Sequence, residues 1–464
     1  MGAVTYVEMD PAARRGEGGG FSVTGSSRSV IKNRMRILVV GSGGREHALV
    51  KALAQSDQVS ALFAAPGNPG TAQKATNVGL EATDLDGLVD FAETEAIDLT
   101  LVGPERPLVA GIVNRFEAAG LPIVGPTKTA AQLEGSKAFA DQFMARHDVP
   151  TASFRVFDAE EADDAAAYLD DVGAPVVVKA DGLAGGKGAF VCSTLDEAHD
   201  ALGQIVNQRA FGAAGDQVVI EEKMEGEEVS VLALTDGAHY VLLPPSQDHK
   251  PIGEGGTGPN TGGMGAFAPA PIVDGALLSR ICREIIEPTL QGMQEEGTPY
   301  RGVLYCGLMI TEEGPKVVEY NCRLGDPEAQ VVLPLVESDL AALFRNLADG
   351  DLQGGNLRTT PGAAACVVLA SDGYPTDYET GFEIAGVGDA EALEDVSVIH
   401  AGTRLTPEGT LVTGGGRVLG VTATGRDLPA ALDRAYDGVD RVEFEGKTYR
   451  RDIGEKGLAH LNAS

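Results

Sequence analysis

The sequence lacks any apolar run that approaches the ~20 residues needed by a membrane-spanning helix. Cysteine is also sparse, with five residues that lie far apart and form no C-x-x-C pair. This argues against a disulfide framework and a zinc site, so we expect reduced thiols in a cytoplasmic protein. With 43% hydrophobic residues, the composition predicts a soluble globular chain with no membrane partner.

Basic residues are the second deficit. The chain has 36 Lys and Arg against 68 Asp and Glu, a formal net charge of −32. This balance excludes an extended nucleic-acid groove, so any phosphate site must be local. The carboxylates are spread along the chain, as in proteins kept soluble by concentrated salt, where screening shortens to about 3 Å. We interpret the protein as halophilic, and the alternative is an ordinary, somewhat acidic protein.

A series of strand-to-turn transitions begins at Met35. The preceding residues, 1–34, are polar and glycine-rich and are expected to be a disordered extension. Ile37 to Val40 is typical of a buried strand, Gly41 to Glu46 of a tight turn, and the following residues of a helix. Further strands at 60–63, 99–102 and 121–124 predict an open parallel sheet whose first turn binds phosphate.

A nicotinamide-dinucleotide domain is the alternative for this first turn. Glu46 stands where the dinucleotide fingerprint has its third glycine, and the second strand ends in Ala64-Ala65-Pro66 without an acidic partner for ribose. NAD binding is therefore the weaker interpretation.

The stretch from Val176 to Gly188, VVVKADGLAGGKG, has a pattern typical of a triphosphate clamp. A β-branched strand ends in Lys179, whose ammonium would be costly to bury without an anion. The glycines that follow let backbone N–H groups approach phosphate, while Lys187 adds a charge. A P-loop is excluded because Asp181 replaces its first glycine and Gly188 its Ser or Thr. An ordinary surface turn is the alternative.

Two further segments would complete a nucleotide site. In our interpretation, backbone groups that follow the strand at 218–221 bind the edge of an adenine ring, and a later carboxylate binds the ribose hydroxyls. These roles suit Glu222, Met224 and Glu228. The alternative is an exposed acidic turn. In the strand at 317–321, period-2 alternation places Glu319 and Asn321 on one face as oxygen ligands suited to Mg²⁺. A polar edge-strand face is equally compatible with that spacing.

The remaining segments surround these motifs. Residues 127–147 are predicted to be helical, with Lys137 just inside a helix start. Residues 246–265 are too rich in glycine and polar side chains for a packed element, and we interpret them as a substrate loop. From about residue 360, strand patterns and one helix predict a small α+β cap with no catalytic cluster.

Eight motifs, in this order, resemble those of the glycinamide ribonucleotide synthetase (phosphoribosylamine–glycine ligase) family: GSGGREHA, APGNPGT, VGPERPL, QLEGSKAF, VVVKADGLAGGKG, SQDHK, TGPNTGGMGA and EYNCRLGDPE. The likeness runs from Met35 to about Gly457. It implies an α/β and α+β multidomain fold with an N-terminal open parallel sheet domain, ATP-grasp lid and central domains, and a small C-terminal α+β cap. The expected boundaries are 1–34 for the extension, 35–136 for the N-terminal domain, 137–225 for the connector and lid, 226–358 for the central domain with the metal strand, and 359–464 for the cap.

The resemblance also implies a reaction. Glycine would be ligated to 5-phosphoribosylamine through glycyl phosphate, giving glycinamide ribonucleotide, ADP and phosphate in purine biosynthesis. ATP would serve with Mg²⁺ or Mn²⁺, and the protein would be a monomer.

The family motifs carry residue roles with them. The resemblance assigns the ATP phosphates to Lys137, Lys179, Gly185, Gly186, Lys187 and Gly188, the adenine to Glu221, Glu222 and Met224, the ribose to Glu228, and the metal to Glu319 and Asn321. It assigns the placing of substrates for catalysis to Asp248, Arg323 and Asp326, and substrate binding to Gly43, Gly44, Arg45, Asn68, Asn260, Thr261, Gly262, Gly263, Met264 and Gly265.

Two alternatives of function remain. Another ATP-grasp carboxylate–amine ligase or carboxylase is disfavoured, because the DHK, NTGGMG and RLGDPE stretches would then lack a reason. A nicotinamide-binding oxidoreductase or sensor is disfavoured by Glu46 and by the missing ribose acid.

The charge predicts a dependence on salt. We expect the melting temperature and activity to rise from dilute buffer to molar KCl, because the net charge of −32 repels itself when it is poorly screened. Thermal melts across a KCl series test this, and a melting temperature that stays flat would refute the halophilic interpretation without touching the enzymatic one.

Overall fold

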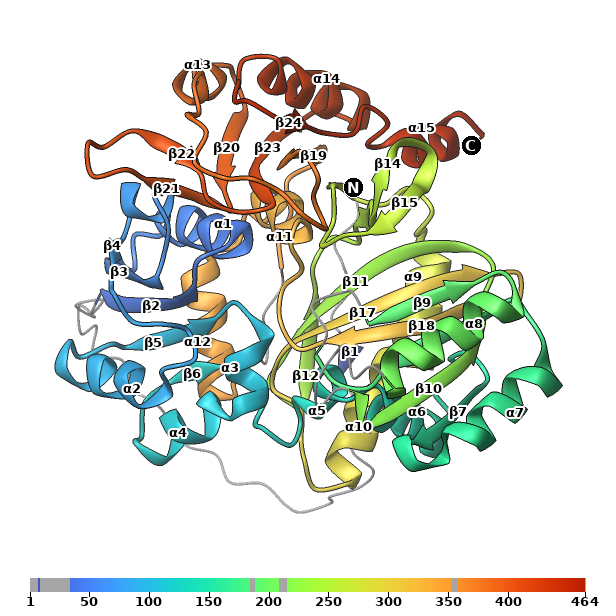
Figure 1. Cartoon of the computed structure of the whole chain (residues 1–464). Helices are drawn as coiled ribbons and strands as arrows, with labels where there is room; N and C mark the ends of the chain where they lie inside the picture. The colour runs from blue at the N-terminus through green and yellow to red at the C-terminus, as the bar shows by residue number, and fades with distance from the viewer. Residues whose placement is uncertain (1–6, 9–33, 184–187, 208–214, 353–356, 464) are drawn as a thin grey trace, which may run out of the picture.

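The computed structural model describes residues 7–8, 34–183, 188–207, 215–352 and 357–463. Three regions surround its centre: an N-terminal domain in blue to cyan, a lid and central sheet in green to yellow, and a C-terminal cap in orange to red (Figure 1). The predicted open parallel sheet and the α+β cap are confirmed.

The N-terminal domain is a five-stranded parallel sheet in the order β4-β3-β2-β5-β6. Its apolar strands are buried on both faces, as parallel sheets require, because helices cover them. The strands are β2 (Met35–Gly41), β3 (Val59–Pro66), β4 (Thr76–Asn77), β5 (Leu99–Val102) and β6 (Ile123–Val124). The helices are α1 (Gly44–Leu53), η1 (Thr71–Gln73), α2 (Leu85–Thr94), α3 (Glu105–Ala110) and α4 (Ile112–Ala118).

A connector and a lid follow. The connector, predicted as one helical segment over 127–147, is two helices, α5 (Gln132–Gly135) and α6 (Lys137–Arg146), because Ser136 is extended and caps α6 through Phe139 N. The lid is an antiparallel sheet in the order β7-β10-β8-β9 with helices on it. Its elements are β7 (Phe154–Asp158), η2 (Ala159–Glu161), α7 (Ala162–Val172), β8 (Val176–Ala180), β9 (Ala189–Cys192), α8 (Leu195–Leu202), η3 (Gly203–Asn207) and β10 (Gln217–Glu222).

The central sheet is antiparallel in the order β1-β12-β11-β17-β18. Its edge strand β1 (Val7–Glu8) comes from the segment expected to be disordered, and no sequence pattern predicts its pairing with β12. The other elements are β11 (Glu227–Thr235), β12 (His239–Leu242), α9 (Gly275–Ile281), η6 (Cys282–Ile286), α10 (Glu287–Glu295), β17 (Gly302–Thr311) and β18 (Gly314–Asn321).

The C-terminal cap has a sheet in the order β13-β16-β19-β23-β20, with β24 beside β19. Its first two strands are β13 (Gln247–Asp248) and β16 (Gly265–Ala268). Its elements are β19 (Ala363–Ser371), α13 (Val387–Glu391), β20 (Val396–His400), β21 (Thr403–Leu405), β22 (Leu411–Thr413), β23 (Arg417–Gly425), α14 (Leu428–Val439), β24 (Lys447–Thr448) and α15 (Glu455–Ala463). Along the chain, the helices α11 (Glu328–Val332), η7 (Leu333–Leu335) and α12 (Leu340–Asp349) follow the last strand of the central sheet and precede β19 of the cap.

The segment at 246–265 differs from the expected loop. It forms β13 (Gln247–Asp248), β14 (Pro251–Gly253), η5 (Glu254–Gly256), β15 (Thr257–Asn260) and the start of β16 (Gly265–Ala268). Strands β13 and β16 belong to the sheet of the cap. Gly265 permits this pairing, because a Cβ there would lie 2.6 Å from the carbonyl oxygen of Cys366 on β19. The stretch therefore ties the central region to the cap.

The domains share buried surfaces. One apolar cluster joins Leu49 and Leu101 of the N-terminal domain to Leu232 of the central sheet and Phe344 of α12. A polar junction joins the N-terminal domain to the cap, where His400 N donates to His47 Nδ1 at 2.8 Å. Burial lowers the pKa of His400 to about 4, which suits a neutral ring inside this junction.

The described residues include no helix that is long and apolar enough to cross a bilayer. All five cysteines are buried and none forms a disulfide.

Candidate functional site

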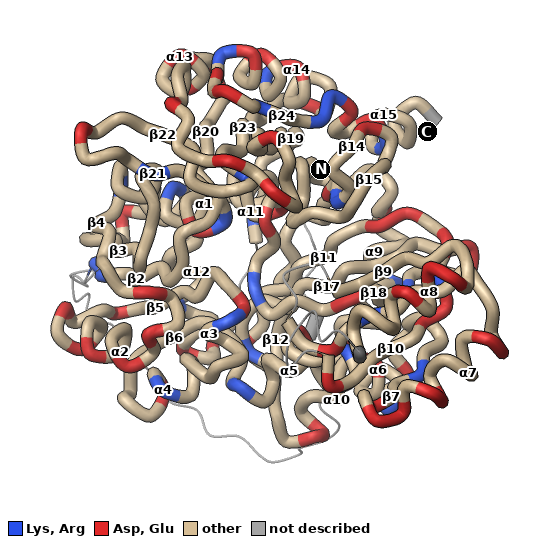
Figure 2. The backbone as a smooth tube through the Cα atoms, viewed as in Figure 1, with Lys and Arg blue, Asp and Glu red and all other residues tan. Residues whose placement is uncertain are grey.

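Charge is unevenly distributed over the molecule. Figure 2 shows Asp and Glu spread over the outer helices, while several Lys and Arg segments lie near the centre, beside α3 and α5. In an acidic protein such a local gathering of cations is the kind of place where an anionic ligand binds.

Lys179 and Glu221 form the buried charge pair of the lid. Lys179 Nζ lies 2.6 Å from Glu221 Oε1 and donates to the carbonyl oxygen of Val318 at 3.2 Å. The register explains the pair, since Val219 is the partner of Lys179 across β8 and β10, and Glu221 lies two residues further on the same face. The side chain of Glu221, assigned to adenine, therefore faces Lys179.

Lys137 begins α6 beside this pair. Its Nζ donates to the carbonyl oxygen of Gly182 at 2.9 Å, and burial lowers its pKa. Asp181 Oδ1 accepts from Ala138 N and from Ser136 Oγ, both at 3.0 Å, which fixes the start of α6 against the glycine-rich turn. Gly188 is buried at the end of that turn. Gly185, Gly186 and Lys187 lie outside the described residues.

Glu319 faces a group of cations on the central sheet. Lys250 Nζ lies 3.6 Å from Glu319 and 3.0 Å from Glu228. Burial acts to raise the pKa of Glu319, but Lys250, Lys179 and Lys137 outweigh it and hold that pKa at about 2. The side chain remains 43% exposed, so its carboxylate is both ionised and accessible.

Asp248 lies beside the same cations. Burial is the largest cause that raises its pKa to about 7, and the charges of Glu328, Glu228 and Glu319 add to it while Lys250 opposes them. Asp248, predicted to place a substrate for catalysis, thus lies at the same cluster as the predicted metal ligand Glu319.

Arg323 is enclosed by carboxylates that the sequence analysis did not select. Its Nη2 lies 2.8 Å from Glu134 Oε1 and donates to Asn321 Oδ1 at 2.8 Å, and its Nε is 3.8 Å from Glu105. Burial acts to raise the pKa of Glu105, but Arg323 outweighs it and the pKa is lowered. Arg323 and Asn321 are therefore joined, with one oxygen lone pair of the amide already in use.

Asp326 connects three domains. Its carboxylate accepts from Arg45 N at 3.2 Å and from Gln330 Nε2 at 2.8 Å, and Arg417 Nη1 from the cap lies 3.4 Å away. Burial acts to raise its pKa, but Arg417 and Arg45 outweigh it and keep the acid ionised. A Cβ on Gly44 would lie 2.6 Å from Gln330 Nε2, so the first turn approaches closely because it is glycine.

The glycine-rich stretch at 260–265 packs against this centre. Arg417 Nη1 donates to the carbonyl oxygens of Gly262 and Asp326, each at 2.6 Å. Thr261 Oγ1 donates to the carbonyl oxygen of Lys250 at 2.7 Å. Gly263 has φ of 110°, and a Cβ there would lie 2.4 Å from Pro327.

Four of the predicted substrate-binding residues have side chains that are buried, exposed to solvent, or already hydrogen-bonded within the protein. Met264 is fully buried, and Asn260 is exposed at the end of β15. The guanidinium of Arg45 donates hydrogen bonds to Glu46 Oε1 at 2.7 Å and to the carbonyl oxygen of Leu324 at 3.1 Å. Asn68 donates to the carbonyl oxygens of Ser42 and His400, and its Oδ1 accepts from Gly70 N and Thr71 N. The hydrogen-bonding capacity of the Asn68 amide is thus used within the protein.

The predicted adenine edge follows β10. Glu222 Oε1 accepts from Ser153 N at 3.1 Å, which anchors the end of the strand. Met224 lies in the irregular stretch between β10 and β11, and its backbone makes no hydrogen bond to another described residue.

The fold therefore brings most predicted residues together. Lys137, Lys179, Glu319 and Lys250 interact in one cluster, and Arg323 joins Asn321 next to it. Sequence reasoning missed Lys250, Glu105 and Glu134 as ligands or partners, although each lies within a quoted motif. It also missed Arg417, which has no motif and reaches the site only through the pairing of the cap sheet.

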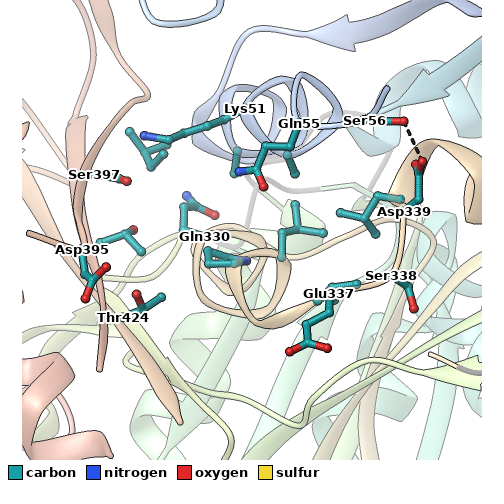
Figure 3. A pocket seen from close by; sticks show the side chains of 18 of the residues that line it. Lys51, Gln55, Ser56, Gln330, Glu337, Ser338, Asp339, Asp395, Ser397 and Thr424 are labelled. Atoms are coloured by element: carbon teal, nitrogen blue, oxygen red, sulfur yellow. Dashed lines mark hydrogen bonds between the residues drawn. The ribbon is translucent and has the colours of Figure 1, made fainter. Parts of the chain in front are cut away.

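A separate cavity of about 600 Å³ lies behind Asp326, between α1, η7 and strands β20 and β23. Figure 3 shows Lys51 and Gln55 along the upper side of the cavity, Gln330 near the middle of the view, and Glu337 and Thr424 toward the bottom. Two of its four acids are already engaged, because Asp339 accepts from Ser56 and Gln58, and Asp395 pairs with Arg434. Lys137, Lys179 and Lys250 are not among the residues that line this cavity. Gln330, which does line it, donates a hydrogen bond to Asp326.

Comparisons with known proteins agree along nearly the whole chain. The family models for phosphoribosylglycinamide synthetase match as the N domain at residues 35–134, the ATP-grasp (A) domain at 135–329 and the C domain at 364–456. A Vibrio cholerae phosphoribosylamine–glycine ligase is 50% identical over 432 residues, covering 92% of this chain and 100% of the relative. The enzyme of that name from Chlorobaculum tepidum is 52% identical over 428 residues, covering 91% and 100%.

Solved structures give the same picture. The crystal structure of phosphoribosylamine–glycine ligase from Thermotoga maritima aligns with a TM-score of 0.78 and 35% identity, covering 90% of this chain and 100% of that one. Biotin carboxylase from Campylobacter jejuni aligns with a TM-score of 0.67 at 15% identity, covering 94% and 96%. The second likeness concerns the fold alone.

The Arg323 enclosure yields a test. Glu134→Gln should lower the free energy of unfolding by roughly 1–3 kcal/mol, because it leaves the buried guanidinium with less compensating charge. It should also lower turnover, because Arg323 loses its anchor beside Asn321. Urea denaturation and turnover assays measure both effects, and Glu117→Gln on the exposed face of α4 is the matched control. Equal stability of the two variants would contradict the role of Glu134.

Proposed function

This chain belongs to the phosphoribosylglycinamide synthetase (phosphoribosylamine–glycine ligase) family, and on that premise we propose that its lysine cluster between the lid and the central sheet is the ATP site. The family resemblance drawn from the sequence motifs is confirmed. The protein is an ATP-dependent, ADP-forming ligase of purine biosynthesis with an ATP-grasp fold. The roles of individual residues and the specific substrates are our proposal.

The observation that carries the proposal is the convergence of Lys137, Lys179 and Lys250 on the ionised Glu319. Cations of this kind attract the phosphates of a nucleotide in an otherwise acidic protein. We assign Lys137, Lys179 and the glycine-rich turn to the phosphates. The backbone around Met224 faces the adenine edge in this assignment, and Glu228 binds ribose.

The residues present fit a divalent cation. Glu319 is an ionised and accessible carboxylate, and the amide oxygen of Asn321 retains one lone pair beside its bond to Arg323. Hard oxygen donors of this kind suit Mg²⁺, or Mn²⁺ in its place. When bound, such an ion neutralises charge on phosphate oxygens. Among the described residues, no group of three or more His, Cys, Asp or Glu side chains is arranged to hold a metal ion, so Glu319 and Asn321 would hold the ion together with the nucleotide.

The proposed chemistry has two steps. The carboxylate of glycine attacks the γ-phosphorus of ATP, which forms glycyl phosphate and releases ADP. The amine of 5-phosphoribosylamine then attacks the acyl carbon, the C–O bond to phosphate breaks, and the amine loses a proton. Neither step needs a protein nucleophile, so the side chains act by positioning and by neutralising charge.

We place the substrates at Arg323, Asp248 and Asp326, next to the first turn and to residues 261–263. The support is geometric, because Asp326 contacts the backbone of Arg45 and shares Arg417 with Gly262. At the start of α1, the N–H of Gly44 would face a 5′-phosphate in this proposal, whereas the N–H of Gly43 already donates to Glu46 Oε2. Asn68 shapes the neighbouring loop instead of binding ligand. We also propose that the protein is cytoplasmic, monomeric and halophilic.

The substrates can be tested directly. We expect ADP release to require both glycine and freshly made 5-phosphoribosylamine, because the acyl phosphate forms only when the site is closed and doubly occupied. A coupled ADP assay with each substrate omitted measures this. Bicarbonate in place of glycine is the control, and ADP release at an equal rate with bicarbonate would point to a carboxylase.

The metal strand can be tested in the same assay. Glu319→Gln should raise the barrier by about 3 kcal/mol, on the order of 100-fold in rate, because it removes the charge and keeps the shape. Asn321→Ala should act in the same direction. Cys322→Ser is the control, because its thiol points away toward Ala131 and it should change Mg²⁺-dependent turnover little. Normal turnover in Glu319→Gln would place the metal elsewhere.

A further inference from the structure

Asp141 is a buried acid for which the proposed chemistry has no use. It lies on α6, one turn after Lys137, and is 5% exposed. It faces Glu221 on β10, which is 4% exposed and already paired with Lys179. The two carboxyl groups are within hydrogen-bonding contact, and Asp141 Oδ2 has no donor among the described residues.

Two carboxyl groups in buried contact require a proton between them. An ionised carboxylate can only accept hydrogen bonds, so two ionised groups would repel across this contact and neither could donate to the other. Lys179 Nζ lies 2.6 Å from Glu221 Oε1, whereas Asp141 forms no ion pair with another described residue. The proton therefore belongs on Asp141.

The charge balance of the site depends on that proton. Lys137 and Lys179 place two positive charges near Asp141, and Glu221 and Glu319 partly offset them. Ionisation of Asp141 would add one more negative charge beside the two lysines and would weaken their attraction for polyphosphate. A neutral Asp141 avoids that loss.

We propose that Asp141 is a positioning residue that stays protonated, donates a hydrogen bond to Glu221, holds Glu221 against Lys179, and weakens nucleotide binding when it ionises. The inference rests on the proposed nucleotide role of Lys137 and Lys179. It concerns a residue outside the motifs that identified the family.

The surroundings of Asp141 agree with this assignment. Burial is the largest cause that raises its pKa to about 8, and the charge of Glu221 adds to it, while Lys179 and Lys137 oppose both. On β18, Tyr320 lies near enough for the charge of Asp141 to help raise the pKa of its hydroxyl, and Glu319 lies near Lys137. Asp181 binds the first turn of α6. The acid is therefore protonated at neutral pH and ionises as pH rises past about 8.

The raised pKa of Asp141 also makes the stability of the folded protein depend on pH. An unfolded Asp titrates near its ordinary pKa of 3.8, so between that pH and about 8 the folded protein binds more protons than the unfolded chain. The contribution of Asp141 to stability therefore falls as pH rises through this window. Asp141→Asn removes it, so the melting temperature of the variant should gain on the wild type from pH 5 to pH 8.

The decisive experiment measures the dissociation constant of ATP with Mg²⁺ from pH 7 to pH 9.5 at constant, high KCl. The wild type should lose affinity above pH 8, approaching tenfold per pH unit as a single group ionises. Asp141→Asn keeps a neutral donor to Glu221, so its affinity should vary little with pH. Asp163→Asn, an exposed acid on α7, is the matched control and should keep the wild-type profile.

Several outcomes would overturn the inference. An alkaline loss of affinity that persists in Asp141→Asn would assign it to another group, of which Lys137 is the first, because burial lowers its pKa. A wild-type profile that is flat to pH 9.5 would also refute it. Failure of ATP to bind at any pH, or normal binding in both Lys137→Ala and Lys179→Ala, would instead refute the proposed nucleotide site.

Infrared spectroscopy gives a readout that does not depend on activity. The wild type should show the C=O stretch of a protonated, buried carboxylic acid that disappears near pH 8 and is absent from Asp141→Asn. If that variant does not fold, Glu221→Gln serves in its place, because it removes the neighbouring anion and should move the loss of the band to lower pH. A band unchanged by either substitution would exclude Asp141.

Discussion

The structure depends on one constraint: a cation that is removed from water needs a carboxylate beside it. Lys179 has Glu221, Arg323 has Glu134, and Arg417 has Asp326. Each of these pairs joins different elements, and the last two join different domains. In a chain with net charge −32 there are many acids on the surface, yet it is internal pairs such as these that lie beside the cations of the site.

Close backbone approach is the second requirement, because the charged groups come from segments distant in sequence. Gly44 lets the first turn reach Gln330, Gly263 lets its loop pack on Pro327, and Gly265 lets β16 pair with β19. A side chain at any of these positions would separate the elements by more than the hydrogen bonds of Asp326 and Arg417 can span. The glycine-rich motifs thus serve the assembly of the site as well as its contact with ligand.

Two kinds of carboxylate therefore coexist in the site. Glu319 is surrounded by lysines and has a pKa of about 2. Asp141, buried beside Glu221, has a pKa of about 8, and Asp248, near Glu328, Glu228 and Glu319, has a pKa of about 7. The same side-chain chemistry is divided by its environment into permanent anions and groups that hold protons near neutral pH. This division separates a group suited to a cation from groups suited to hydrogen-bond donation.

The sequence by itself determined the parallel N-terminal sheet, the strands of the cap, the family, and the common face of Glu319 and Asn321, because strand alternation, turn glycines and contiguous motifs are local properties. It could not place Arg417 or Asp141, or give Asn68 its structural role, because these depend on which strands pair across domains and which side chains lose water together. Val7–Glu8 pairing with β12, and β13 and β16 joining the cap sheet, are likewise contacts between residues far apart in the chain. Only the tertiary structure decides such pairings, since burial and charge compensation are set by all the neighbours of a residue at once.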